Sequence, residues 1–438
     1  MVAKKELVVI GAGLAGLSVG ALLAKKGVEV LVIEEDLEVG GRARVIEKDG
    51  FILEYGPRSY DYGEKSSANQ IMKELGLSPE WLTENQGNWL IKGKDLYQIP
   101  SLNQSLTQAE PGYFTEAEII KLKQALEKLS REKIEKYLRK SLADALGNLL
   151  KEEKLLLLSQ LLGMELLEPE PKRLSAGELV LYLERKKSAL ANSCQLKGSS
   201  RVMIQAMVKT IERFAELKTR DRALTLEIEK NRVKSLNTTE GVIEPGAVVW
   251  TGSLAQFFQL AAAVSFPEKW LRKVKRMDRV SGLSLDFGLR EKVSEVKGWL
   301  FEPASKILAR FPSNLDPSLA PQGKQLSSWM ILVSEQEVND PEAVRSAIHQ
   351  LRAQIKRVFP DFFALAEWER ILHLPIIDSS TLTHKRSRID RVEINAPGLE
   401  NVFFAGDSIA APGVRSEIAL RSGIEASQRC LAYLGRGG

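Results

Sequence analysis

Residues 1–35 alternate between apolar runs and a glycine-rich segment in an order that predicts a βαβ unit. An apolar run at Leu7–Ile10 is followed by GAGLAG at Gly11–Gly16, and a second β-rich run at Val28–Ile33 precedes the acidic Glu34. A strand, a glycine turn, a helix and a second strand ending in an acid form the unit that binds dinucleotides. We therefore predict a parallel α/β sheet at the start of the chain.

The glycines of this turn have separate predicted roles. Gly11 makes the tight turn, Gly13 lets backbone amides approach a pyrophosphate, and Gly16 lets the helix pack closely on the strand. The diphosphate then faces the helix N-terminus, where backbone N–H groups are unpaired. Glu34 is predicted to accept hydrogen bonds from the ribose hydroxyls.

The first apolar run also admits a second interpretation. Leu7–Ala24 carries no charge and follows Lys4 and Lys5, a pattern that also occurs in signal peptides and membrane anchors. The glycine spacing, the immediate second strand and Glu34 are explained by the nucleotide fold and by nothing in a targeting sequence. We therefore expect an unprocessed, cytoplasmic chain.

Downstream patterns predict a hairpin, a helical insertion and further pieces of sheet. Val45–Tyr55 alternates and is broken by Asp49-Gly50, which is typical of a hairpin. Helical spacing extends over Ser67–Leu190, and strand-like runs return at Ala223–Thr251. Further expected elements are the strands Ser281–Leu289, Ser327–Val333, Trp368–Leu374 and Asn401–Asp407 and the helices Val202–Leu217, Pro341–Val358 and Ser416–Leu434.

Composition narrows the class of protein. The 438 residues are enough for two or three domains. The net charge of +5, from 62 basic and 57 acidic residues, is mild, so we expect no nucleic-acid partner. The two cysteines and three histidines lack ligand spacing, which disfavours a disulfide framework and a metal site. The dense charge of the helical insertion predicts a solvated face, with peripheral contact at a membrane surface as the alternative.

Four separated motifs occur in a fixed order along the chain. They are GAGLAG with Glu34, GGRAR at residues 40–44, GFILEYGPR at residues 50–58, and FFAGD at residues 403–407 before the last helix. Together they resemble the flavin amine oxidase superfamily, and within it the phytoene-desaturase-like branch. The resemblance covers the whole chain and is strongest over its two ends.

This resemblance implies a fold and a cofactor. The fold is α/β, a glutathione-reductase-type, Rossmann-like FAD/NAD(P)-binding domain interleaved with an α+β substrate domain that carries the helical insertion. The implied FAD-binding domain comprises residues 1–66, 198–255 and 385–438, and the substrate domain residues 67–197 and 256–384. FAD would be held without a covalent bond, because no cysteine precedes the FFAGD motif at a suitable spacing.

The resemblance assigns one set of residues to the nucleotide end of FAD. The diphosphate would face the amides of the glycine turn, with Arg42 beside it, since a planar and always charged donor matches phosphate geometry. Ala223 would touch the adenine. The residues assigned to this end are Gly11, Gly13, Leu14, Ala15, Gly16, Glu34, Gly41, Arg42 and Ala223.

A second set of residues is assigned to the flavin end. A side chain at position 56 would collide with the ring, and Asp407 would bind the ribityl chain or the diphosphate. The amides near the start of the last helix would face the flavin C2 carbonyl and stabilise negative charge on the reduced ring. The residues assigned to this end are Gly56, Pro57, Arg58, Gly406, Asp407, Glu417 and Ile418.

The chain departs from the family pattern in four places. The strand Val280–Leu289 has no lysine, whereas amine-oxidising members carry one near flavin N5, and Asp378–Asp390 lacks the aromatic pair that cages an amine. Gly198-Ser199-Ser200 replaces a Gly-Gly pair, and Glu54 stands where an aspartate is usual. No catalytic base can be named.

The resemblance therefore implies an FAD-dependent oxidoreductase that accepts hydride at flavin N5 from an apolar, isoprenoid- or carotenoid-like or polycyclic substrate. The electron acceptor would be oxygen or a quinone. The substrate would enter an apolar channel between the domains. The candidate lining residues are Trp250, Phe257, Phe258, Trp299 and Trp329.

Four further functions stay open at this point. Protoporphyrinogen-oxidase-like activity is the nearest, and flavin-dependent amine oxidation is more distant. A flavin-binding protein whose redox chemistry has lapsed belongs to another functional class. A sugar-nucleotide mutase would need an arginine-rich cleft, for which Arg386, Arg388 and Arg391 are the local candidates.

Overall fold

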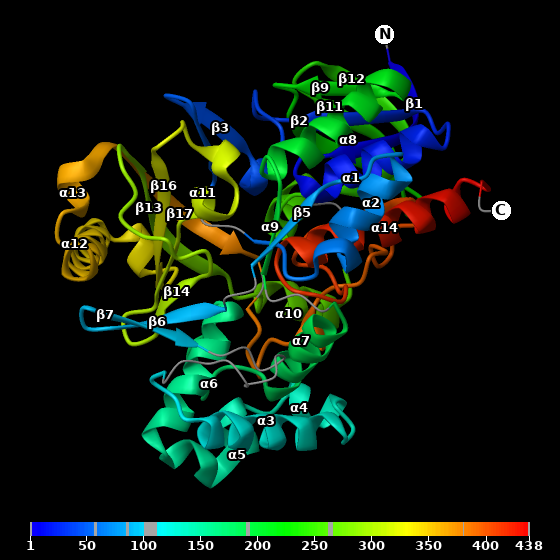
Figure 1. The fold of residues 1–438 in the computed structure, drawn as a ribbon. Helices are drawn as coiled ribbons and strands as arrows, with labels where there is room; N and C mark the ends of the chain where they lie inside the picture. Colours follow the sequence, from blue (N-terminus) through cyan, green and yellow to red (C-terminus); the bar gives the residue numbers. More distant parts are fainter. Residues whose placement is uncertain are drawn as a thin grey trace.

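The computed structural model describes residues 2–56, 59–84, 87–99, 112–189, 193–261, 266–379 and 381–436. Within these residues the chain forms two seven-stranded sheets and a separate group of helices. Figure 1 shows the first sheet and its helices at the upper right, the second sheet at the left and the helical group at the bottom. The chain is therefore α/β, as predicted.

The first sheet has the strand order β10-β11-β12-β1-β2-β9, with β18 beside β12. Strands β1, β2, β12 and β18 run parallel, and the carboxyl-terminal halves of β1 and β12 are buried on both faces, as are Val30–Ile33, which explains the continuous apolar runs at Leu7–Ile10 and Val30–Ile33. The sheet and its helices comprise β1 (Ala3–Ile10), β2 (Val30–Glu34), β9 (Glu216–Thr219), β10 (Ala223–Glu229), β11 (Arg232–Thr238), β12 (Gly241–Trp250), β18 (Val402–Phe404), α1 (Leu14–Lys25), α8 (Ser200–Phe214) and α14 (Ser416–Tyr433).

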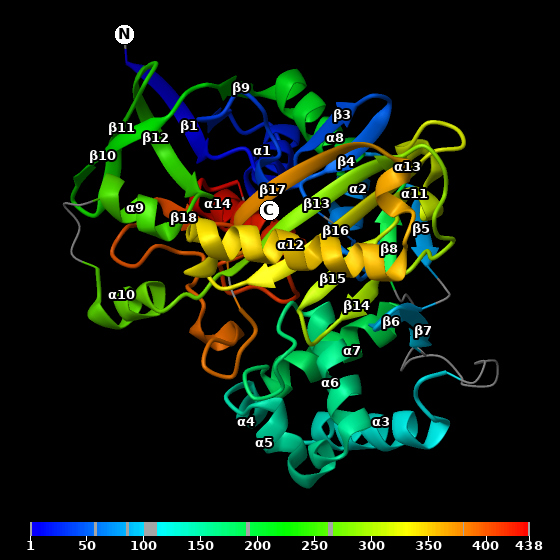
Figure 2. The same ribbon diagram turned by 90° about the vertical axis from the view of Figure 1, so that its left-hand side faces the viewer.

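The second sheet has the strand order β17-β13-β16-β15-β14-β6-β7. Helix α12 (Pro341–Val358) lies across one face (Figure 2), where Leu351 and Ile355 join the same apolar cluster as Trp329. Successive side chains alternate, so Met330 points to the opposite face. The strands are β6 (Asn88–Lys92), β7 (Asp95–Ile99), β13 (Val280–Leu289), β14 (Leu300–Glu302), β15 (Ile307–Arg310), β16 (Gln325–Val333) and β17 (Ala366–Asp378).

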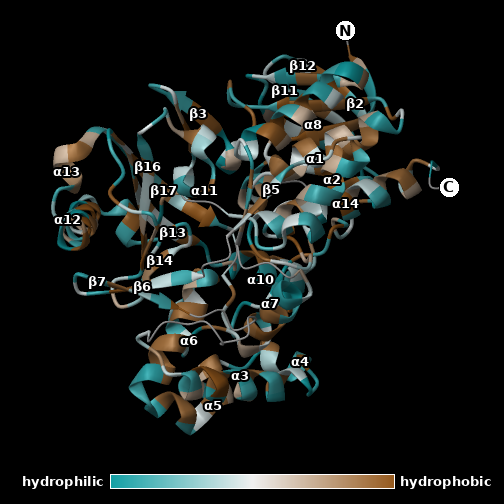
Figure 3. Ribbon diagram, viewed as in Figure 1, coloured by the Kyte–Doolittle hydropathy of each residue, from teal (hydrophilic) through white to brown (hydrophobic). Residues whose placement is uncertain are grey.

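The helical group mixes apolar and polar residues along its helices (Figure 3), and its apolar side chains are buried in one cluster. It comprises α3 (Glu116–Ser130), α4 (Glu135–Leu138), α5 (Leu142–Leu146), α6 (Glu153–Glu165) and α7 (Ala176–Ala189). Thr115 and Glu118 form a capping box at the start of α3, and the helical spacing of Ile119 and Leu122 buries both side chains. Among the helices that the structure describes, none is both long and apolar enough to cross a membrane.

Several predicted elements are confirmed, and one prediction is partly wrong. Val45–Tyr55 forms a hairpin whose Asp49 and Gly50 both have positive φ, as its tight turn requires. Ser67–Leu190 is not helical throughout, because it contains β6, β7 and β5 (Trp81–Glu84). Gly93, with φ of 66°, separates two short strand runs that hydrogen-bond into a hairpin, so tertiary pairing prevails over helical spacing there.

The remaining elements connect the three parts. They are β3 (Val45–Lys48), β4 (Phe51–Glu54), α2 (Ser67–Glu74), β8 (Ser193–Leu196), α9 (Leu254–Leu260), α10 (Glu268–Lys275), α11 (Pro312–Leu315) and α13 (Phe362–Leu365). Helices α2 and α10, which the predicted boundaries assign to the substrate domain, pack Ile71 and Trp270 into the core of the first sheet. The division into domains stays a prediction.

Candidate functional site

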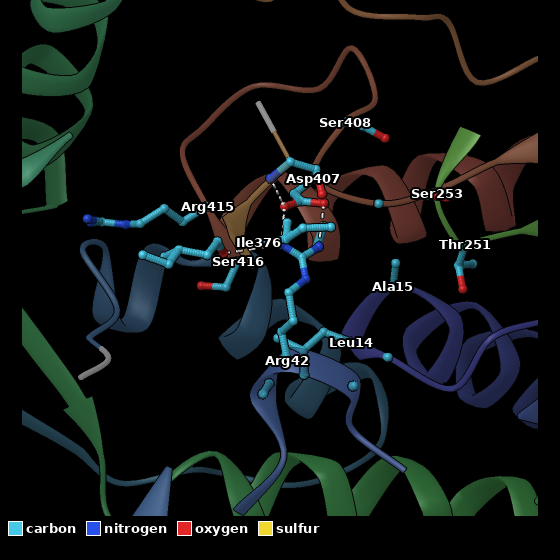
Figure 4. Close-up of a pocket in the computed structure, with 18 of the residues that line it drawn as sticks. Leu14, Ala15, Arg42, Thr251, Ser253, Ile376, Asp407, Ser408, Arg415 and Ser416 are labelled. Atoms are coloured by element: carbon cyan, nitrogen blue, oxygen red, sulfur yellow. Dashed lines mark hydrogen bonds and ion pairs between the residues drawn. The ribbon is translucent and has the colours of Figure 1, made fainter. Parts of the chain in front are cut away.

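A cavity of about 1140 Å³ extends from the glycine turn after β1 to the face of the second sheet opposite α12. One end is lined by residues at the carboxyl ends of β1, β2 and β12, where parallel α/β sheets bind ligands. The other end is lined by residues of β16, β17, α6 and α7. Figure 4 shows the middle of this cavity.

The glycine turn has the geometry that the sequence predicts. Gly11 has φ of +101°, and a Cβ at Gly16 would lie 1.8 Å from the Gly11 carbonyl oxygen. A Cβ at Gly13 would meet no protein atom within 4 Å, although Gly13 lines the cavity. Two glycines are therefore required by the fold, and the third leaves open space in front of α1, where Leu14 and Ala15 also line the cavity.

Glu34 and Ala223 lie at the same end of the cavity. The Glu34 carboxylate accepts hydrogen bonds from the amides of Ala12 at 2.6 Å and Asp36 at 3.0 Å. These bonds fix the side chain at the end of β2, beside the glycine turn. The arrangement fits the predicted ribose and adenine contacts, which stay predictions.

Arg42 and Asp407 form a two-pronged ion pair in the middle of the cavity (Figure 4). Arg42 Nη1 and Nη2 each lie 2.7 Å from one Asp407 oxygen, and the amide of Ser379 donates to Asp407 Oδ2 at 2.8 Å. Arg42 comes from the short 3-10 helix Gly41–Ala43 and keeps 46% of its side chain exposed. An exposed guanidinium beside a helix N-terminus suits a diphosphate.

Asp378 and Asp407 form a second polar contact at this point. Burial raises the pKa of Asp378 to about 8, and the adjacent Asp407 charge adds to that effect. Burial also acts to raise the pKa of Asp407, but the Arg42 guanidinium holds it well below its usual range. Of the two carboxyl groups, Asp378 is therefore the one that holds a proton more tightly.

Gly56 is not itself among the residues that line the cavity, but it lies against Met330 and Leu374 of the second sheet, which do line it. It has φ of +80°, and a Cβ there would lie 3.0 Å from Met330 Cε and 3.3 Å from Leu374 Cδ1. The protein alone therefore disfavours a side chain at position 56. The neighbouring Pro57 and Arg58 lie outside the described residues.

The start of α14 faces the cavity through Arg415 and Ser416 (Figure 4). The amide of Glu417 donates to the Val414 oxygen and that of Ile418 donates to the Arg415 oxygen, both at 3.1 Å. The two amides that the sequence singles out are therefore engaged within the chain. Gly406 and Asp407, which follow β18, line the cavity, and their contacts with FAD stay predictions.

The far end of the cavity contains a polar cluster that the sequence did not reveal. Its members, which we call the polar end, are Asp61, Asn88, Glu165, Tyr182, Lys186 and Arg415. Glu165 accepts from Lys186 at 2.6 Å and from Tyr182 and Asn88 at 2.9 Å each. Arg415 pairs with Asp61 and donates to the Glu165 backbone oxygen. The six residues come from five segments, so no local sequence signal identifies them.

Between the polar end and Gly56 the cavity has an apolar wall, formed by Trp299, Phe301, Leu308, Met330 and Leu374. Of the predicted lining aromatics, Trp250 and Trp299 line the cavity. The prediction is wrong for the other three. Phe257 and Trp329 are fully buried in the two cores, and Phe258 packs against Phe266 and Trp270.

Comparison with known proteins identifies relatives of this chain. The family model described as flavin containing amine oxidoreductase matches residues 14–431. A coproporphyrinogen III oxidase from Staphylococcus aureus is 34% identical over 99 residues, 22% of this chain and 21% of that protein. A 4,4'-diapophytoene desaturase from the same species is 44% identical over 52 residues, 12% of this chain and 10% of that protein. The alignments thus span about a fifth or less of these two relatives.

The fold likeness extends over the whole chain. An oxidoreductase from Methanosarcina mazei has a TM-score of 0.79 to this structure, at 17% identity. The match covers 96% of this chain and 99% of that protein. At this identity the likeness concerns the fold.

The glycine turn generates a prediction that separates folding from cofactor binding. We expect Gly13→Ala to fold with an unchanged melting temperature but to bind FAD at least about tenfold more weakly, because its methyl group enters open cavity. Gly16→Ala should instead lower the melting temperature, because its methyl group meets the Gly11 carbonyl. Thermal unfolding and FAD titration of both variants provide the check. Equal effects of the two variants on folding would contradict this assignment.

The aspartate pair generates a prediction of pH dependence. The folded chain holds a proton on Asp378 up to a pKa of about 8, whereas the unfolded chain releases it near the ordinary pKa of 3.8. The contribution of this proton to the free energy of unfolding is therefore fully present below pH 3.8 and is lost as the pH rises from 3.8 to about 8. Asp378→Asn has a neutral group at every pH. Between pH 3.8 and about 8 its free energy of unfolding should therefore rise relative to that of the parent, by at most about 1.4 kcal/mol for each unit of increasing pH. Urea unfolding of both FAD-free proteins measures the difference, and a constant difference would exclude a protonated Asp378.

Proposed function

This chain belongs to the flavin containing amine oxidoreductases and is an FAD-dependent oxidoreductase, and from that premise we propose that it oxidises a substrate with a large apolar body. The observation that carries the proposal is the apolar wall beside Gly56, where the flavin end of the cofactor is expected. The rings of Trp299 and Phe301 are parallel there, and their centroids lie 6.2 Å apart. A polyene or a polycyclic ring packs well on such a surface.

The residues present fit FAD. The open space at Gly13 and the N-terminus of α1 would receive the diphosphate, with Arg42 as the cationic donor and Glu34 at the ribose. Buried Cys194 and Cys430 do not line the cavity, which supports a non-covalent cofactor. When bound, FAD supplies a ring that accepts a hydride from the substrate.

The chain's own residues then perform three tasks. The apolar wall holds the substrate and excludes water from the reacting face. The N-terminus of α14, with Arg415 beside it, favours negative charge at this point of the cavity. Arg42, fixed by Asp407, orients the phosphate end. A desaturase-like reaction on an isoprenoid substrate, with oxygen or a quinone as acceptor, uses these features without a dedicated base, because the proton that leaves the carbon next to the hydride donor passes to a weak base or to water at the edge of the site.

The polar end favours a second candidate, a porphyrinogen. Such a substrate combines a broad apolar macrocycle with carboxylate side chains. Lys186 is buried and, among the described residues, has Glu165 as its hydrogen-bond partner, so further N–H donors of its ammonium group remain for a carboxylate. The identity to a coproporphyrinogen III oxidase over 99 residues supports the same candidate.

Amine oxidation and sugar-nucleotide chemistry receive less support. The strand β13 has no lysine for amine oxidation. Two of the three arginines suggested for a sugar-nucleotide site are engaged elsewhere, since Arg388 pairs with Glu178 and Arg386 donates to the Arg276 backbone oxygen. Neither they nor Arg391 are among the residues that line the cavity. A protein whose redox chemistry has lapsed would bind flavin, but no substrate would reduce that flavin.

We expect the purified protein to release free FAD on heat denaturation and to bleach reversibly on anaerobic titration with dithionite. Isoprenoid polyenes and porphyrinogens should then be screened for anaerobic reduction of the bound flavin. Bleaching by a substrate of either class supports the proposal. A flavin that dithionite reduces but that neither substrate class reduces would indicate a different substrate.

The polar end generates a prediction that separates the two substrate classes. In Lys186→Met/Glu165→Gln the ion pair is removed as a unit, so no buried charge is left unpaired, and Asn88 and Tyr182 keep a partner. If the substrate is a porphyrinogen, its KM should rise about tenfold or more. Turnover of an uncharged polyene should be unchanged. The exposed neighbour Lys187→Met serves as the control.

A further inference from the structure

Two of the departures from the family pattern meet in the structure. Glu54, at the end of β4, replaces the usual aspartate, and Ser200, at the start of α8, replaces part of a Gly-Gly pair. Glu54 Oε1 accepts hydrogen bonds from both the amide, at 2.9 Å, and the hydroxyl of Ser200. The Ser200 hydroxyl also lies 2.8 Å from the Tyr60 hydroxyl. The two substituted positions therefore form one part-buried contact.

This contact encloses the segment that faces the flavin end of the cavity. Glu54 precedes Tyr55 and Gly56, and Tyr60 follows the same loop. Ser200 thus holds both ends of the loop, one through the Glu54 carboxylate and one through the Tyr60 hydroxyl. Tyr60 is also tied to Cys194 by two backbone hydrogen bonds of 2.7 and 2.9 Å.

The second sheet holds the same loop from its other side. Arg370 on β17 donates to the Glu54 backbone oxygen and forms an ion pair with Asp286 on β13, with Nε 2.9 Å from Oδ2. Arg370 and Asp286 are almost entirely buried, and Ser328 donates to the other Asp286 oxygen. Burying an ion pair costs about as much free energy as the attraction between its charges returns, so the Arg370–Asp286 pair is not explained by a gain in stability. A role in positioning the loop explains it better.

We propose that Glu54 is a positioning residue for the bound flavin, because its carboxylate anchors the Tyr55–Gly56 segment to Ser200 while Arg370 anchors the same peptide to the second sheet. The segment is then fixed between the two sheets. A Cβ at Gly56 would lie 3.0 Å from Met330 and 3.3 Å from Leu374, and both of these side chains line the cavity, so a shift of the loop presses on this wall. This inference rests on FAD binding and is independent of the substrate class.

The experiment compares Glu54→Ala with Glu47→Ala. Glu47 lies on the same hairpin and pairs with Arg201, the neighbour of Ser200, but it is 61% exposed. We expect Glu54→Ala to weaken FAD binding about tenfold and to shift the visible absorption bands and the reduction potential of the bound flavin. Glu47→Ala should change none of these quantities. Glu54→Gln keeps the Oε1 acceptor and should restore values close to those of the parent.

A purely structural role gives a different result. In that case Glu54→Ala lowers the melting temperature, while the flavin dissociation constant, spectrum and potential stay at parental values, which would overturn the proposal. If Glu54→Ala does not fold, Ser200→Ala provides the test, because it removes the hydroxyl contacts to Glu54 and Tyr60 and keeps the amide. Its flavin spectrum should shift in the same direction, and an unchanged spectrum would equally overturn the proposal. None of these readouts requires turnover, so they remain decisive if the proposed substrate is wrong.

Discussion

The ion pair between Arg42 and Asp407 is the interaction on which the rest of the site depends. Its partners are separated by 365 residues, and it joins the segment after β2 to the segment after β18. Arg42 also donates to the Ile377 oxygen, and Ser379 donates to Asp407, so the end of β17 meets the same point. The Arg42 guanidinium thus joins the carboxyl edge of the first sheet to strand β17 of the second sheet. Arg42, Asp407, Ile377 and Ser379 all line the cavity, so this contact forms part of its wall.

The polar groups of the cavity balance one another, which limits the cost of burying them. Asp407 pairs with Arg42, Asp61 with Arg415 and Glu165 with Lys186, while burial raises the pKa of the adjacent Asp378 and so favours its neutral form. A ligand phosphate would compete with Asp407 for Arg42. Proton affinity at the aspartate pair and cofactor affinity are therefore linked through a single guanidinium.

The sequence predicted the parts of the site that are encoded locally. Gly11, Gly13, Glu34, Arg42 and Asp407 lie in short motifs whose spacing has a physical meaning, and all five line one cavity. The polar end was missed because Asp61, Glu165 and Lys186 come together only through tertiary packing. The predicted aromatic lining failed at Trp329 because the strand alternation directs it to α12, and one residue of register decides the face.

The departures from the family pattern carry a further consequence for the flavin loop. A Gly-Gly pair would offer Glu54 only backbone amides, whereas Ser200 adds a hydroxyl that also reaches Tyr60. The neighbouring serine, Ser199, has a φ of 70°, a conformation that glycine adopts more readily. Replacing the glycine at this position therefore adds backbone strain to the turn. The Ser199-Ser200 pair thus combines backbone strain at Ser199 with a hydroxyl at Ser200 that contacts both ends of the loop. Such an exchange is understandable where the position of the loop matters more than the stability of the turn.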